Sequence, residues 1–140
     1  MADMEHEITW GGDYEDVRVT ASGSCTAKAM SDCQQTLTAD PRFRSGMRVL
    51  IDHRLVDWSR MTPEDVRKVV EMLVRNAAKF GATYCAMVMG KPVDFGIARM
   101  QQHYAEADSG LQIEFRVFSN VEDARRWFAT LPAPAPPADS

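Results

Sequence analysis

The fold is decided by one stretch of the chain, RVLIDHRLVDWSRMTPEDVRKVVEMLVRNAAKFGATYCA (Arg48–Ala86). Two apolar runs near its ends, Met47–Asp52 and Thr83–Met89, lack the alternation of half-buried strands and indicate strands covered on both faces. A charged loop, His53–Met61, in which Trp58 is expected to be exposed, and a helix, Thr62–Phe80, connect them. Parallel strands joined by a helix nearly always cross over right-handed, so this unit predicts a parallel pair inside an α/β sheet.

The helix over Thr62–Phe80 has a recognisable start, end and buried face. Thr62 suits the N-cap, Pro63 suits the first helical position, and Gly81 can end the helix with a positive φ. Its apolar residues recur on one face, opposite most of the charged ones: Val66, Val69, Val70, Leu73, Ala77 and Phe80. Burying each large apolar side chain contributes about 1.5–3 kcal/mol, so we expect this face to anchor the fold.

The rest of the chain supplies further strands and helices around this unit. The expected elements are strands at Ile8–Trp10, Val17–Ala21 and Leu111–Val117, and helices at Thr26–Ala39, Val93–Ala107 and Val121–Thr130. This order predicts an α/β fold: a mixed sheet with an N-terminal β-hairpin followed by right-handed βα units (β-β-α-β-α-β-α-β-α). Residues 1–131 are expected to form a single domain and residues 132–140 a proline-rich flexible tail. Gly96 is interpreted as a close-packing site rather than a place of ligand approach.

Composition excludes several classes of function. The 140 residues carry a net charge of −4 and a sequence pI of about 5.3, which argues against nucleic acid as a partner. The three cysteines, Cys25, Cys33 and Cys85, and the three histidines show no metal-ligand spacing, so we expect no metal. Unpaired cysteines and the absence of a signal peptide favour a cytoplasmic location. No apolar run is long enough to span a bilayer.

Five blocks of the sequence resemble a known group. Pro41–Asp52, Thr62–Val66, Asp94–Met100, Phe115–Phe118 and Glu122–Phe128 are similar in order and spacing to the SpoIIAA-like branch of the STAS/SEC14-type domains, the superfamily of anti-sigma-factor antagonists. The resemblance covers nearly the whole chain except the proline-rich tail. It implies a mixed sheet with right-handed βα turns and a small bacterial regulatory or binding module that is not an enzyme and needs no cofactor.

One departure from that group bears on regulation. Partner-switching STAS domains carry a phosphorylatable Ser or Thr in an Asp-Ser-Ser-Gly-like segment at the start of the helix that follows this strand. The matching region, Asp57–Thr62, lacks that segment. Ser59 or Thr62 is still a candidate for phosphorylation in an anti-anti-sigma-type switch. The alternative is that Thr62 is an N-cap and Ser59 a loop residue.

Candidate binding residues gather where parallel strands end, since open α/β sheets bind ligands beyond those ends. Asp52, His53 and Arg54 follow the first buried strand and suit an acid–base or anion-binding group, or a solvated loop. Lys91 stands beside a helix N-terminus, where it could hold a phosphate or carboxylate. An apolar set, Trp58, Met61 and Phe95, could line a pocket or close the end of the core.

These residues predict a non-enzymatic binding or regulatory module. The expected ligand is a small apolar or amphipathic molecule, or a protein partner, at the end of the sheet near Trp58, Lys91 and Phe95. Peripheral membrane contact through the apolar residues and a homodimer through open sheet edges are further possibilities.

Overall fold

Five strands form one mixed sheet in the computed structural model, which describes residues 2–108 and 110–132. The strands are β1 (Glu5–Trp10), β2 (Val17–Ser24), β3 (Arg48–Asp57), β4 (Tyr84–Val88) and β5 (Glu114–Phe118). They lie in the order β1-β2-β3-β4-β5, with β1 antiparallel to β2 and all other neighbours parallel. The predicted mixed sheet with an N-terminal hairpin is therefore confirmed.

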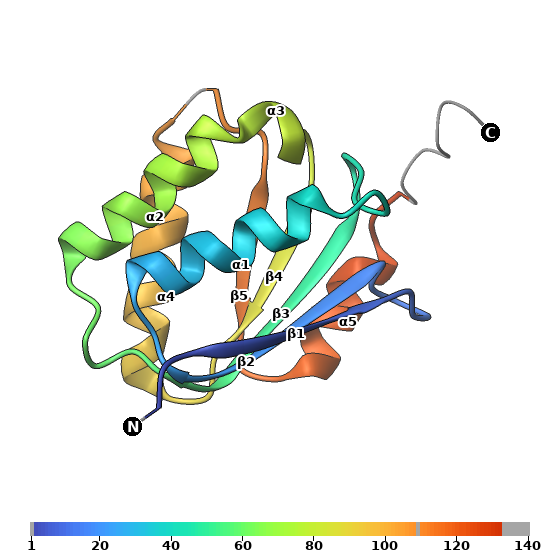
Figure 1. The fold of residues 1–140 in the computed structure, drawn as a ribbon. Coiled ribbons are helices and arrows are strands. Elements are labelled where there is room, and N and C mark those ends of the chain that lie inside the picture. Colours follow the sequence, from blue (N-terminus) through green and yellow to red (C-terminus); the bar gives the residue numbers. More distant parts are fainter. Residues whose placement is uncertain (1, 109, 133–140) are drawn as a thin grey trace.

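Helices cover both faces of this sheet (Figure 1). The described helices are α1 (Ala27–Ala39), α2 (Pro63–Arg75), the short α3 (Ala77–Phe80), α4 (Pro92–Glu106) and α5 (Val121–Ala129). Helices α1, α2 and α4 pack on one face and α5 on the other (Figure 1). From β2 to β5 the strands advance in one direction, and each crossover helix covers the same face. The three βα units therefore share one hand, as the right-handed rule requires.

The start of α2 shows why this segment is helical. The Thr62 hydroxyl accepts a hydrogen bond from the Asp65 backbone N–H at 3.1 Å, and the Asp65 carboxylate accepts one from the Thr62 N–H at 3.0 Å. This capping box pairs two backbone amides at the start of the helix, and Pro63 has no amide hydrogen that needs a partner. The predicted single helix to Phe80 is interrupted at Asn76, whose side-chain amide donates to the Met72 carbonyl.

Two apolar layers hold the sheet between its helices. On the face of α1, α2 and α4, buried residues such as Val69, Leu73 and Met87 form the larger cluster. On the α5 face, Leu50 and Phe128 are fully buried with neighbours from β4. Strands β3 and β4 contribute to both layers, which explains why their sequences show no polar alternation.

Strand β3 is longer than the sequence indicates. Its pairing with β2 continues past a register shift between Thr20 and Ser22, where Ser22 lies opposite Leu55 and Ser24 opposite Asp57. The segment His53–Asp57 is therefore strand, and the predicted loop His53–Met61 is wrong over those five residues. The charged sequence of His53–Asp57 is typical of a loop, but its backbone pairing with the long strand β2 makes it a strand. The last strand begins at Glu114 instead of Leu111.

Gly96 does not have the predicted packing role. It lies in α4, is exposed, and a Cβ atom built there would meet nothing within 4 Å. Gly96→Ala is therefore expected to stabilise the protein by about 0.5–1 kcal/mol, because alanine loses less backbone entropy in a helix. Urea unfolding at equilibrium measures the change.

Gly90 provides the matched control, since a Cβ atom there would lie 3.0 Å from the Arg54 carbonyl oxygen. Gly90→Ala is expected to leave stability unchanged or to reduce it. A loss of stability in Gly96→Ala would contradict the open position that the structure shows.

Candidate functional site

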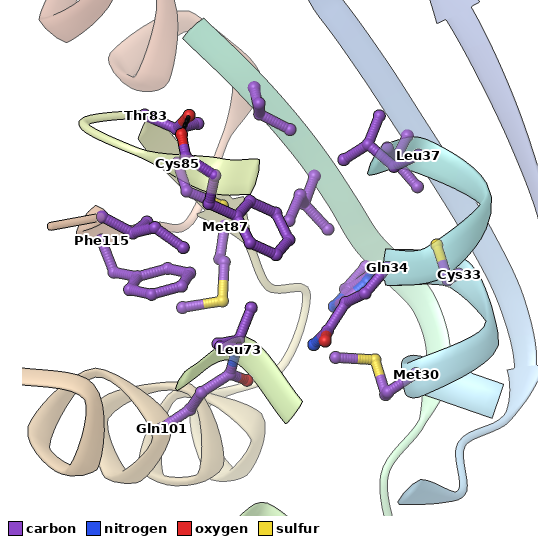
Figure 2. Close-up of a pocket in the computed structure, with 16 residues that line it drawn as sticks. Met30, Cys33, Gln34, Leu37, Leu73, Thr83, Cys85, Met87, Gln101 and Phe115 are labelled. Carbon is purple, nitrogen blue, oxygen red and sulfur yellow. Dashed lines mark hydrogen bonds between the residues drawn. The ribbon is translucent and has the colours of Figure 1, made fainter. Parts of the chain in front are cut away.

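A cavity of about 50 Å³ lies between the sheet and the helices α1, α2 and α4. Sixteen residues line it, and most of them are apolar. Met30 and Leu37 come from α1, Leu73 from α2, and Met87 and Phe115 from the central and edge strands (Figure 2). The cavity thus sits inside the larger apolar layer, where α1 closes over the sheet.

Four polar side chains interrupt this apolar wall: Gln34, His53, Thr83 and Gln101. The Thr83 hydroxyl is satisfied because it donates to the Phe80 carbonyl. The Gln34 Oε1 and His53 Nδ1 atoms are buried and have no hydrogen-bond partner within the described part of the chain. In Figure 2, Gln34 from α1 and Gln101 from α4 extend toward the same space from different walls. Polar groups from three elements therefore converge on one apolar cavity.

His53 packs against Trp58 beside the cavity. Their ring centroids lie 5.0 Å apart, and only 2% of His53 and 3% of Trp58 is exposed. Burial lowers the pKa of His53 to about 4, although the nearby Asp52 carboxylate acts in the opposite direction. His53 is therefore neutral at pH 7. One of its ring nitrogens then donates a hydrogen bond and the other accepts one, and the tautomer decides which does which.

Asp52 belongs to the opposite face of the sheet. It is buried, and its carboxylate accepts hydrogen bonds from Arg54 at 2.7 and 2.9 Å and from Arg18 at 3.0 Å. The hydrogen bonds from Arg54 lower the pKa of Asp52 to about 2, against the effect of burial, and Arg18 adds to the shift. Since neighbouring residues of a strand point to opposite faces, the pleat separates Asp52 and Arg54 from His53. The predicted acid–base group does not assemble.

The predicted apolar set is mostly part of the core. Trp58, which its charged surroundings indicated as exposed, is buried, so that interpretation is wrong. Met61 and Phe95 are half-buried against the same cluster. Lys91 is exposed at the N-cap position of α4 and makes no side-chain cap. A ligand site formed by Trp58, Lys91 and Phe95 at the end of the sheet stays a prediction, as do a homodimer and membrane contact.

The two candidate phosphorylation sites differ in their surroundings. Thr62 is the N-cap of α2, and its hydroxyl oxygen is engaged by the Asp65 amide. Ser59 is exposed in the loop after β3, and its backbone N–H donates to the Asp57 carboxylate at 3.0 Å. The structural role predicted for Thr62 is confirmed, whereas phosphorylation of either residue stays a prediction.

Sequence reasoning missed Gln34 and Gln101 as site residues. A signal was present, because both glutamines occur at inward-facing helical positions. Gln101 shares the buried face of α4 with Ala98 and Ala105, at spacings of three and four residues. Gln34 lies between the buried Met30 and Leu37 of α1. A polar residue at such a position indicates either a buried hydrogen bond or a ligand.

Residues 2–108 and 110–132 contain neither a metal-binding cluster nor a membrane-spanning helix. They contain no group of three or more His, Cys, Asp or Glu side chains arranged to hold a metal ion. No helix in the same ranges is long and apolar enough to cross a bilayer.

Comparison with known proteins supports the fold. No protein-family model matches the chain, and no curated protein has a similar sequence. Among solved structures, the chain is similar to an uncharacterized protein of the DUF3478 family with a SpoIIAA-like fold from Shewanella loihica PV-4. The two chains are 16% identical, with a TM-score of 0.55 over 90% of this chain and 94% of the other. The fold is therefore SpoIIAA-like, as the resemblance predicted.

Proposed function

We propose that this protein is a cytoplasmic, non-enzymatic binding module that holds a small, mainly apolar ligand in the cavity beneath α1. The observation that carries the proposal is the cavity itself, whose wall is mostly apolar and contains two buried polar atoms without partners, Gln34 Oε1 and His53 Nδ1. Ligand pockets typically combine apolar walls with a few placed polar groups. In a regulatory module, such a ligand would act by changing how α1 packs.

The size of the cavity limits the ligand. Its 50 Å³ compares with about 10–15 Å³ for a cavity that just holds one water molecule, so the empty site accepts a molecule of only a few heavy atoms. Met30 and Met87 reach into the site from α1 and β4 (Figure 2). Methionine side chains are unbranched and adaptable, and their movement would make room for a somewhat larger ligand.

The cysteines in the wall favour binding over catalysis. Burial raises the pKa of Cys33 to about 11 and also raises the pKa of Cys85. Both thiols are therefore protonated at neutral pH and are poor nucleophiles. His53 is also buried and neutral, and its Nδ1 has no carboxylate partner in the described residues.

Native mass spectrometry tests the proposal with the intact protein purified from its own cells. We expect a low-mass, non-covalent adduct on the wild-type chain. We expect Cys33→Met to lack it, because the longer side chain fills the cavity from the wall of α1. The exposed Gln35→Met on the same helix is the control and should retain the adduct. An adduct that persists in Cys33→Met would place the ligand elsewhere.

A further inference from the structure

We infer that the ligand is an uncharged amphipathic molecule that can donate a hydrogen bond, such as an alcohol or a primary amide, whose single polar group is bound by Gln34, His53 and Gln101. This inference rests on the proposed function and adds the chemical class of the ligand. It follows from three features of the cavity: its unpartnered polar atoms, the absence of charge in its wall and the placement of its amide groups.

Two buried polar atoms in the wall are open to a hydrogen bond from a ligand. Gln34 Oε1 and His53 Nδ1 are both shielded from solvent without a hydrogen bond in the described residues. Native proteins satisfy the large majority of such atoms, because an unsatisfied buried group is costly. A ligand hydroxyl can donate to Gln34 Oε1 and can accept from His53 Nδ1 in the tautomer that carries its proton there.

The wall contains no charged side chain to balance a charged ligand. None of the sixteen lining residues is Asp, Glu, Lys or Arg. The buried carboxylate nearest in sequence to the cavity, Asp52, is engaged by Arg18 and Arg54 on the other face of the sheet. An ion enclosed here would lose its hydration without gaining a counter-ion, which is strongly unfavourable. A carboxylate or ammonium ligand is therefore excluded from the site.

The amide groups define where the polar end of the ligand lies. Gln34 projects from α1 and Gln101 from α4, and each amide offers both a donor and an acceptor. Gln101 is only 5% exposed, and His53 reaches the cavity from β3 with 2% exposure. The rest of the wall is mostly apolar and would surround the apolar end of the ligand. The site can thus distinguish a hydroxyl from a methyl group of the same size.

A series of four matched probes tests the inference by NMR titration of the full chain: 1-butanol, its isostere pentane, butyrate and butylammonium. We expect 1-butanol and pentane to bind saturably, and the two ions to show no saturable binding. Gln34→Leu is expected to weaken 1-butanol about five- to tenfold, the usual effect of one hydrogen bond, without weakening pentane. Gln35→Leu, an exposed neighbour on α1, should change neither affinity.

If Gln34→Leu does not fold, a second pair of variants on α4 gives the same comparison. Gln101→Leu is then the test, and Gln102→Leu, at a more exposed position, is the control. Butyrate or butylammonium binding as tightly as 1-butanol would overturn the inference, as would an equal loss for pentane and 1-butanol in the glutamine variants. Failure of all four probes to bind would instead overturn the proposed function.

Discussion

Between pH 7 and pH 4, the free energy of unfolding is expected to fall by about 3 kcal/mol because of His53 alone. The folded protein holds this imidazole neutral in an almost fully buried site beside the cavity, where its pKa is about 4. The ordinary value in an unfolded chain is 6.5. The unfolded chain therefore binds a proton that the folded chain does not, throughout the range between these two values.

The direction of the effect follows from that difference. The contribution is fully present above pH 6.5 and is lost as the pH falls toward 4, because protonation favours the unfolded chain. Asp52 acts at lower pH: its pKa is about 2 instead of 3.8, so its contribution is lost below about pH 4. The two groups can be separated by their pH ranges.

Chemical denaturation of wild type and His53→Phe at several pH values measures the contribution. The phenylalanine keeps a ring against Trp58 but cannot be protonated, so stability should change little between pH 6.5 and pH 4. His103→Phe is the control, since His103 is exposed on α4, and it should retain the wild-type pH dependence. An unchanged pH dependence in His53→Phe would show that His53 is not the group responsible.

Phe128→Ala is expected to destabilise the protein by about 3–5 kcal/mol. Phe128 lies on α5, has no exposed surface, and stacks on Trp127 with ring centroids 5.4 Å apart. It packs with Leu50 and Val88 in the apolar layer on that face of the sheet. Its truncation leaves a cavity in this layer and removes one of the three buried side chains that anchor α5.

Equilibrium unfolding in urea measures this loss, with Arg126→Ala as the control. Arg126 is exposed on the same helix, and its weak ion pair with Asp123, at 3.5 Å, is expected to contribute less than about 1 kcal/mol. A loss below about 1 kcal/mol in Phe128→Ala would mean that α5 does not hold this face of the sheet.

The sequence predicts the fold well where the signals are local. Thr62, Pro63 and the apolar face from Val66 onward specify α2 without reference to the rest of the chain. The uninterrupted apolar runs of β3 and β4 likewise indicate strands covered on both faces. These elements and their order are sufficient to predict a mixed sheet with helical crossovers.

The prediction is wrong where distant residues decide the structure. The extension of β3 to Asp57 depends on the length of β2, which supplies partners as far as Ser24. Trp58 is surrounded by charged and polar residues in the sequence. It is nevertheless buried against His53, because it directly follows β3, which contains His53 and ends at Asp57. Local composition does not contain this information.

The cavity was missed for the same reason. Its polar residues Gln34, His53 and Gln101 come from α1, β3 and α4, and only the packed structure brings them together. Of the seven candidate binding residues identified from the sequence, His53 alone lines this cavity. Inward-facing glutamines on helices α1 and α4 are the signal that could have identified the other two.

The most direct test of the proposed binding site is an NMR titration of the full chain, carrying ¹³C-labelled methionine methyl groups, with 1-butanol. Met30 and Met87 line the cavity, whereas Met72 lies on the outer side of α2 beside Arg75. The methyl signals of Met30 and Met87 should shift together and saturate with the same dissociation constant, while that of Met72 stays unchanged. Signals from Met30 and Met87 that do not move, or that move linearly together with Met72, would contradict a ligand site in this cavity.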